Sequence, residues 1–201
     1  MPAPEKFLPV WRAAKPYLRA RKNDVHVPIS YHCAEKILRQ HPEADSEIVL
    51  LAVLLHDIGW AEIDEKEIFE KAFGPNMEQI LSSDLRRLHE EIGARLAREI
   101  LLSLDYSGDV IDAVVKIIDG HDSRAHALSR EDELMKDADK LWRFTTTGIA
   151  VACDWHKWTP ARYVQYLHQE VYPSLFTDAA RNLAMERLEM ACEELMIEVM
   201  T

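Results

Sequence analysis

The sequence predicts an all-α protein folded as a single compact bundle of helices. Apolar residues recur at helical spacing over most of the 201 residues, and no segment sustains the period-two alternation of a half-buried strand. Glycine is scarce, with 6 residues, and proline is modest, with 9. The length and the apolar content of 48% suit one domain, residues 1–201, with a substantial buried core.

The first two helices are predicted from residues that break them. The first covers about residues 5–21, and the polar segment 21–24 ends it. Pro28 suits the first turn of the second helix because its fixed φ is helical and a first-turn N–H has no helical partner. That helix runs to about Gln40, where His41-Pro42 ends it.

The third helix, about residues 47–58, is predicted to lie at the centre of the molecule. Ser46 is its expected N-cap and Gly59 its expected stop. The run 48–55 is apolar on all sides, so a buried strand would give the same pattern. Ala52 and the four leucines of this stretch favour a buried helix.

The remaining helices are predicted from amphipathic stripes and from serine or threonine N-caps. They are a short helix around 65–72, one from Ser82 or Ser83 to about Ser103, one over about 109–120, one opened by the capping-box pair Ser129 and Asp132 and running to about Thr146, one from Thr159-Pro160 to before Pro173, and one from Thr177 to near the C-terminus.

The acidic net charge of −11 argues against two classes of partner. A chain of this charge repels both a nucleic-acid backbone and an anionic membrane surface. We therefore expect neither nucleic acid nor membrane as a partner, although a local basic pocket would still bind a small anion.

The chain carries no sign of export or of membrane insertion. The longest apolar run, 48–55, is far below the roughly 20 residues of a membrane span. Residues 1–10 contain prolines and a glutamate where a signal peptide would have its apolar core. The cysteines form no CxxC pair, which disfavours a disulfide framework and a thiolate zinc site; they are Cys33, Cys153 and Cys192. A reducing cytoplasm fits these features best.

Nine histidines are the feature that most needs an explanation. His56-Asp57 follows the most apolar helix, where burying a histidine and an aspartate is costly unless something pairs with them. A divalent cation accepts neutral imidazole and carboxylate together, and a hydrogen-bonded helix end is the alternative. The second His-Asp pair is His121-Asp122, and chance alone gives about 0.7 such pairs in this composition.

Two further histidines lie on buried helix faces. His121 shares a face with Val114 and Ile117, and His89 shares one with Leu85 and Leu96. A single histidine on such a face is usually a satisfied core residue. Several together favour a shared ligand.

Two aspartates in the middle of one predicted helix complete the candidate set. Asp137 and Asp139 both lie at positions where aspartate is a poor helix former. An exposed aspartate would need no explanation, whereas Asp139 turned inward would require a cation.

In this order, the residues resemble the HD superfamily of metal-dependent phosphohydrolases. The string from Ala52 to Gly59 is similar to the family's central His-Asp motif. Asp139, in the string Ala-Asp-Lys-Leu, is similar to the last aspartate, and His89 and His121 are similar to the two histidines between them. The resemblance covers about residues 24–145 and implies an HD-domain bundle with a helical C-terminal extension over 146–201.

Two histidines precede the His-Asp motif at a suitable distance, His26 and His32. In the family the first ligand opens a helix, with small residues often four and eight positions on. His26 has Ser30 and Ala34 there, so the resemblance favours His26 over His32.

The resemblance implies a metal site with one or two divalent transition-metal ions. Its implied ligands are His26, His56, Asp57, His89, His121 and Asp139. A set rich in nitrogen suits iron, manganese, cobalt, nickel or zinc better than calcium. The implied catalytic residues are Asp57, His89, His121 and Lys140.

The function this implies is hydrolysis of a small phosphate ester, or a nucleotide, by water that the metal activates. An alternative is a dinuclear iron oxygenase acting on a polyol or phosphonate, because family members of that kind share the ligand pattern. A third class, a regulatory module without enzymatic activity, would ordinarily lack part of the ligand set.

One position departs from the family pattern. Members often have a lysine directly after Ile-Gly, near the substrate phosphate, and this chain has Trp60. Lys140, Arg143 and Arg124 are the candidates to compensate for it. The tryptophan mildly favours the oxygenase alternative.

Two apolar features are expected to be structural. Trp155, His156 and Trp158 suit core packing or the wall of a cleft better than nucleic-acid stacking. The helix after Thr177 carries a stripe of leucine and methionine, which we expect to be core or a homodimer contact.

Overall fold

The computed structural model describes residues 5–81 and 84–196, and within them every regular element is a helix. The all-α prediction is therefore confirmed. The α-helices are α1 (Leu8–Ala14), α2 (Asn23–Leu38), α3 (Ser46–Leu55), α4 (Glu65–Lys71), α5 (Met77–Leu81), α6 (Leu85–Ser103), α7 (Gly108–Ile118), α8 (Arg130–Leu141), α9 (Thr146–His156), α10 (Pro160–Tyr166) and α11 (Asp178–Glu194).

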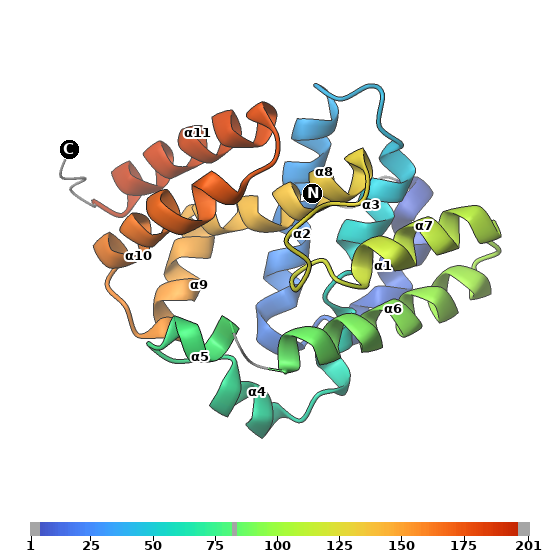
Figure 1. Ribbon diagram of the computed structural model, residues 1–201, viewed down its shortest axis with the longest axis horizontal. Helices are drawn as coiled ribbons and strands as arrows, with labels where there is room; N and C mark the ends of the chain where they lie inside the picture. Colours follow the sequence, from blue (N-terminus) through green and yellow to red (C-terminus); the bar gives the residue numbers. More distant parts are fainter. Residues whose placement is uncertain (1–4, 82–83, 197–201) are drawn as a thin grey trace.

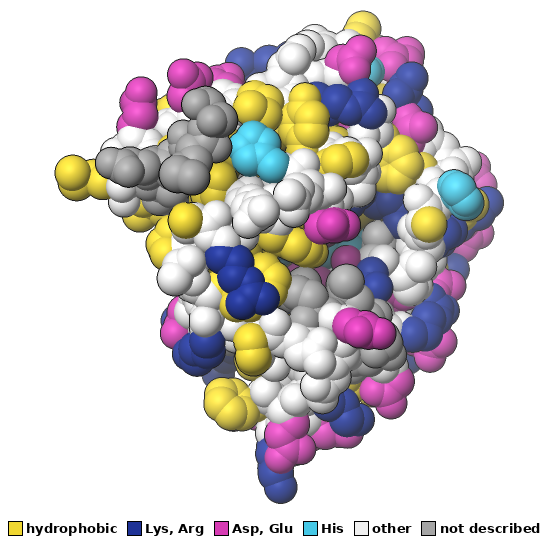
Figure 2. Space-filling model, turned by 60° about the vertical axis from the view of Figure 1, so that its left-hand side comes forward, with side chains coloured by type: hydrophobic (Ala, Val, Ile, Leu, Met, Phe, Trp, Pro, Cys, Tyr) yellow, Lys and Arg dark blue, Asp and Glu magenta, His cyan; other side chains and the backbone are white. Residues whose placement is uncertain are grey.

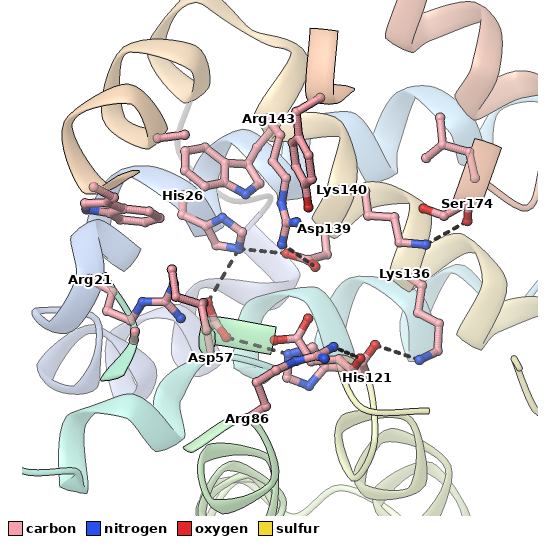
Figure 3. A pocket seen from close by; sticks show the side chains of 18 of the residues that line it. Arg21, His26, Asp57, Arg86, His121, Lys136, Asp139, Lys140, Arg143 and Ser174 are labelled. Carbon is pink, nitrogen blue, oxygen red and sulfur yellow. Dashed lines mark hydrogen bonds and ion pairs between the residues drawn. The ribbon is translucent and has the colours of Figure 1, made fainter. Parts of the chain in front are cut away.

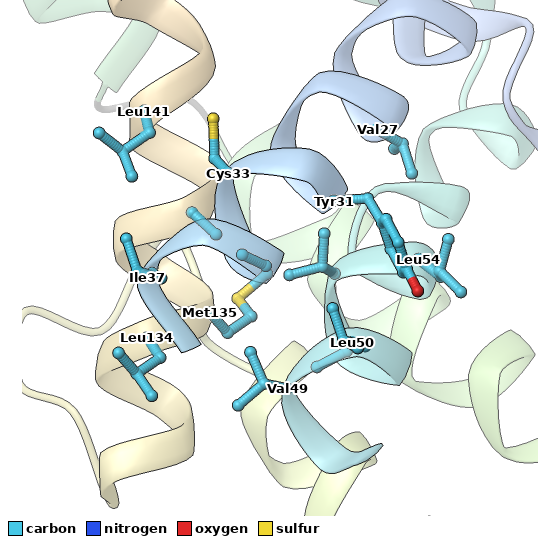
Figure 4. Packing of buried hydrophobic residues seen from close by; sticks show 14 of the residues in the cluster. Val27, Tyr31, Cys33, Ile37, Val49, Leu50, Leu54, Leu134, Met135 and Leu141 are labelled. Atoms are coloured by element: carbon cyan, nitrogen blue, oxygen red, sulfur yellow. The ribbon is translucent and has the colours of Figure 1, made fainter. Parts of the chain in front are cut away.

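Helix α3 lies in the middle of the molecule, as its sequence predicts (Figure 1). Every residue from Val49 to Leu55 is buried. The helix packs against α2, α7 and α8, so all of its sides meet another helix. Figure 4 shows apolar side chains of α2, α3 and α8 meeting in this core, among them Ile37, Leu54 and Met135.

The other elements surround this centre in three groups (Figure 1). Helices α6 and α7 pack against each other on one side, and α6 also packs on the 3₁₀ turn η4 (Ile58–Glu62) that follows α3. Helices α9, α10 and α11 form the opposite side, and α4 and α5 lie between the two groups. The three groups leave a cavity next to the C-terminal end of α3.

The first two helices differ from their predicted bounds. Helix α1 stops at Ala14 and continues as 3₁₀ turns, because the ring of Pro16 opposes a further α-helical turn. Helix α2 begins at Asn23, earlier than predicted, and contains Pro28 in its interior. The helix therefore lacks the hydrogen bond that the residue-28 N–H would give to the carbonyl of Asp24.

The start and the end of α3 also correct the prediction. Its N-cap is Asp45, whose carboxylate accepts hydrogen bonds from the N–H groups of Glu47 and Ile48, and Ser46 is the first helical residue. The helix ends at Leu55, and Gly59 lies within the turn η4 and does not stop it. A Cβ at Gly59 would stand 2.0 Å from the carbonyl oxygen of His89.

We expect Asp45→Ala to destabilise the protein and Ser46→Ala to leave its stability nearly unchanged. Losing the two cap hydrogen bonds costs about 1 kcal/mol, which lowers Tm by about 2–4 °C in a chain of this size. Thermal unfolding followed by circular dichroism measures both variants. Equal losses, or a larger loss for Ser46→Ala, would contradict this assignment of the cap.

The middle of the chain follows the prediction with one addition. Helix α4 has the predicted position, whereas the short helix α5 was not predicted. Ser82 and Ser83, the predicted caps of α6, lie outside the described residues, and Asp84 precedes the first turn. Helix α7 follows its N-cap Ser107 closely.

The helix predicted from Ser129 to about Thr146 ends earlier than expected, and a further helix follows it. Ser129 caps α8, as predicted, by accepting from the N–H of Asp132. Helix α8 ends at Leu141, and Thr145 caps the unpredicted α9. Thr159 and Thr177 cap α10 and α11, as predicted. After α10 the chain continues as π and 3₁₀ turns to Ser174.

Two further expectations from the sequence can be compared with the structure. None of the helices among residues 5–81 and 84–196 is both long and apolar enough to cross a membrane. All three cysteines are free thiols.

Candidate metal centre

Five parts of the chain bring the six predicted ligands to one place. His26 comes from α2, His56 and Asp57 follow the last turn of α3, His89 comes from α6, His121 follows α7, and Asp139 comes from α8. All six residues are buried, and none exposes more than 9% of its total surface. Figure 3 shows His26, Asp57, His121 and Asp139 pointing towards one another.

The six side chains form two groups that share Asp57. His26, His56 and Asp57 offer ligand atoms that all lie within 4.8 Å of one another, and so do Asp57, His89 and His121. Asp139 joins the first group, because its Oδ1 is 3.1 Å from Nε2 of His26 and 3.4 Å from Nε2 of His56. The arrangement suits one ion in each group, with Asp57 reaching both.

Hydrogen bonds fix which ring nitrogens can bind an ion. Nδ1 of His56 lies 2.9 Å from the carbonyl of Val53, and Nδ1 of His89 and of His121 each lie 3.0 Å from a carbonyl of their own segment. A carbonyl only accepts, so Nδ1 carries the proton and Nε2 of the neutral ring presents a lone pair.

The lone pairs that result face each other at short range. Nε2 of His89 is 3.3 Å from Nε2 of His121, and Nε2 of His26 is 2.9 Å from Nε2 of His56. His89 and His121 both carry their proton on Nδ1, so neither neutral ring has a proton on Nε2 for a hydrogen bond between the two. Such a bond would require one of the rings to be charged. A cation ligated by these nitrogens satisfies both, so the donor set fits a divalent transition metal.

Burial and the neighbouring charges of the cluster shift the pKa values of its members. Burial raises the pKa of Asp57, but the charges of His56 and His26 and the hydrogen bond from His121 outweigh it and hold the pKa well below its usual range. Burial and the charge of His121 lower the pKa of His89 to about 4. Burial opposes protonation of His121 too, but Asp57 and Asp122 raise its pKa to about 9.

His32, the other candidate for the first ligand, lies outside this cluster. Its side chain is 41% exposed and its Nδ1 faces Glu35 at 3.6 Å. The structure thus brings His26 into the cluster and leaves His32 on the surface of α2. Asp137 is buried but structural, because its carboxylate accepts hydrogen bonds from Phe176 and Thr177.

Trp60 has a role in the cluster that its sequence position alone did not reveal. Its indole stacks on the ring of His89, with centroids 4.2 Å apart. Its Nε1–H donates to Oδ1 of Asp57 at 3.1 Å. Trp60 therefore orients two candidate ligands at once.

The loop after α7 is held by two buried charges that sequence reasoning missed. The carboxylate of Glu90 accepts hydrogen bonds from the N–H groups of Asp122 and Ser123. The amine of Lys136 donates to the carbonyls of Gly120 and His121. A glutamate on the buried face of α6 and a lysine on the buried face of α8 are the signals in the sequence that could have indicated this role. Their partner is a loop distant in sequence, so the sequence does not identify it. Together they fix the position of His121.

The three basic residues proposed to compensate for Trp60 lie in different surroundings. Lys140 donates to the carbonyl of Ser174 at 2.7 Å, away from the ligand cluster (Figure 3). Arg124 donates to Asp132 and to the carbonyl of Asp119. Only Arg143 of these three faces a candidate ligand, with its Nη2 3.9 Å from Asp139.

The cluster forms part of the wall of a cavity of about 640 Å³. This volume is ordinary for a small-molecule site. Figure 2 shows one face of the molecule with a hollow in which histidine and carboxylate atoms are visible and Lys and Arg side chains lie close by. The basic side chains that line the cavity are Arg21, Arg86, Arg124, Lys136, Lys140, Arg143 and Arg181. The carboxylates are Asp57, Asp122 and Asp139.

Aromatic side chains form much of the remaining wall. Trp142, Trp155, Tyr163 and Tyr166 line the cavity, and His156 lies beside them. Trp155 and His156, two of the three residues of the predicted aromatic cluster, therefore belong to the wall of this cavity. Trp158 does not line it, and its indole donates to the carbonyl of Pro75.

The sequence matches the family model of the HD domain over residues 26–143, more than half of the chain. Two solved structures have a similar fold. A crystal structure described as a predicted HD superfamily hydrolase, from an uncultured Thermotogales bacterium, is 19% identical with a TM-score of 0.59, and the match covers 93% of this chain and 87% of that chain. A protein from Lactobacillus plantarum is 14% identical with a TM-score of 0.57, and the match covers 97% and 95% of the two chains. No curated protein matches the chain.

Proposed function

This chain belongs to the HD-domain family, and from that membership we propose that it is a metal-dependent phosphohydrolase that acts on a small phosphomonoester. The observation that carries the proposal is the pair of His/Asp groups sharing Asp57 at the wall of a cavity. The basic side chains around the cavity support an anionic substrate.

His26, His56, Asp57, His89, His121 and Asp139 would hold one or two divalent ions. Such an ion, when bound, lowers the pKa of water to near neutrality and withdraws charge from phosphoryl oxygens. The backbone carbonyls that hold the Nδ1 protons of His56, His89 and His121 keep the Nε2 atoms of these three rings turned inward, so this part of the ligand cluster is organised before an ion arrives. Trp60 keeps the shared carboxylate of Asp57 in place.

Phosphate binding would depend on the guanidinium groups that face the cluster. Arg143 enters from the side of Asp139, where it would neutralise charge on a phosphoryl oxygen. A phosphomonoester carries nearly two negative charges near pH 7 and a diester carries one. The excess of cations over carboxylates in the cavity therefore favours the monoester.

The test is phosphate release from a broad panel of phosphoesters by protein loaded in turn with manganese, nickel, cobalt, zinc and iron. The panel includes p-nitrophenyl phosphate and bis(p-nitrophenyl) phosphate, so that monoester and diester cleavage are compared directly. We expect release from monoesters and none from the Asp57→Ala variant. No release with any metal, or equal release from the variant, would reject the proposal.

We expect Trp60→Phe to lower kcat/KM for phosphate release by about 10- to 100-fold, the usual cost of losing a hydrogen bond to a metal ligand. Phenylalanine keeps a ring against His89 but loses the donor to Asp57. The matched control is Trp158→Phe, which loses an indole hydrogen bond outside the cavity. An unchanged kcat/KM in Trp60→Phe would remove this role from Trp60.

One other interpretation of the ligand pattern receives no such support. The dinuclear iron oxygenase is not favoured, because the relatives that the fold resembles include a predicted hydrolase and the cavity is basic.

We also propose a cytoplasmic location on the strength of three free thiols, and leave homodimerisation as a prediction from the apolar residues of α11.

A further inference from the structure

Arg21 stands in a backbone conformation that few arginines adopt. Its φ is 49°, and the next residue, Lys22, has φ 58°, so two consecutive residues are left-handed. This region is sterically unfavourable for any residue that carries a Cβ atom. This paired conformation places Arg21 directly before α2, at the wall of the cavity.

The guanidinium of Arg21 is surrounded by aromatic faces. Its Cζ lies 4.3 Å from the ring centroid of Trp60, 5.1 Å from that of Trp155 and 5.8 Å from that of Phe73. These rings pack around the guanidinium but offer it no hydrogen-bond acceptor. Its Nε is buried without a hydrogen-bond partner, and no ion pair joins Arg21 to another described residue.

The other cations of the cavity wall have partners that hold them. Lys136 bonds to three backbone carbonyls, and Lys140 bonds to the carbonyl of Ser174. Arg181 bonds to Asp178 and to the carbonyl of Leu175, and Arg143 faces Asp139. Within the described residues Arg143 and Arg21 donate no hydrogen bond to a protein group, and of these two Arg21 also has no ion pair, so its donors remain available to a ligand.

Arg21 also faces the candidate metal ligands. The charges of Asp57, Asp122 and Asp139 all act on it, although none lies within ion-pair distance. Figure 3 shows its guanidinium directed towards Asp57, across the cavity from Arg143. An anion between Arg21 and the ligand cluster would meet unused, planar donors on one side.

We propose that Arg21 binds the phosphate of the substrate, held in place for that purpose by Trp60 and Trp155. This inference rests on the proposed function for the identity of the anion as a phosphate ester. It adds a specificity residue that lies outside the family match of residues 26–143. The gain comes from preorganisation, since the side chain is already oriented before the anion arrives.

The experiment measures binding of inorganic phosphate by isothermal titration calorimetry, with the metal content of each sample determined. Arg21→Met is compared with Arg162→Met, because Arg162 lies over the Trp158 ring at 4.0 Å and does not line the cavity. We expect Kd for phosphate to rise about 10- to 100-fold in Arg21→Met and to stay within twofold in Arg162→Met. Arg21→Lys, which keeps the charge but loses the planar fork, should fall between them.

A second measurement needs no variant. In the wild-type protein, phosphate should slow the modification of Arg21 by phenylglyoxal, measured by peptide mass spectrometry, and leave that of Arg162 unchanged. Absence of protection, or wild-type affinity for phosphate in a folded Arg21→Met protein of normal metal content, would overturn the proposal. If phosphate binds through Arg21 while no phosphoester is hydrolysed, the proposed function fails and this inference stands.

Discussion

The Asp57→Ala variant is expected to lose metal and to release phosphate at least about 10³ times more slowly than the wild type. Asp57 is the carboxylate shared by the two groups of candidate ligands, so its loss affects both. A metal that activates water and stabilises charge supplies several kcal/mol of the barrier reduction, and about 4 kcal/mol corresponds to a factor of 10³. Elemental analysis and phosphate release measured on the same samples test the two effects together.

The matched control is Asp154→Asn, which changes an exposed aspartate whose one ion-pair partner among the described residues is Lys157. It should retain full metal content and full activity. Asp57→Asn serves as the second variant, because it keeps the shape of the side chain if Asp57→Ala unfolds. A variant at position 57 with normal metal content and normal kcat/KM would exclude Asp57 from the centre.

Gly59→Ala is expected to destabilise the protein by about 3 kcal/mol or more, which lowers Tm by about 10 °C. A Cβ there would stand 2.0 Å from the carbonyl oxygen of His89 and 2.6 Å from the amide nitrogen of Gly93. Both atoms belong to the backbone of α6, so no side-chain rotation can relieve the overlap. The turn η4 would move away from α6, and His89 would shift relative to Asp57.

Gly108→Ala is the control for this effect, since beyond its own stretch of helix no atom of the described residues comes within 4 Å of a Cβ at that position. Gly108 begins α7, where alanine is the better helix former. Its Tm should stay the same or rise slightly. A Gly59→Ala protein with wild-type Tm and wild-type metal affinity would contradict the close contact between η4 and α6.

Local signals in the sequence predicted most of the helices and several of their caps. Thr159 and Thr177 cap their helices by bonds that span three residues, which the sequence itself contains. Asp45 and Ser46 are both good caps, so propensity alone could not choose between them. The break at Trp142–Phe144 was missed because it depends on packing: the Trp142 ring meets His26 edge to face at 4.7 Å.

The candidate ligands could be named from their order and helical context, but the cation that faces them could not. The order of histidines and aspartates is a property of the chain. Arg21 gains its place from two left-handed residues and from Trp60 and Trp155, which are distant in sequence. Lys140 illustrates the converse, because it lies next to Asp139 in sequence while its amine reaches Ser174.

The candidate ligands lie on segments spread from α2 to α8, so an ion bound among them would tie together stretches of chain that folding brings together from far apart. Such an ion acts as a reversible cross-link, and an ion that binds only the native state stabilises it by mass action. At a free concentration a thousand times Kd the gain is about 4 kcal/mol, a large share of the stability of an ordinary domain. The survival of this protein against unfolding and proteolysis should therefore follow the supply of its metal, so that a scarcity of the ion removes the folded protein as well as its activity.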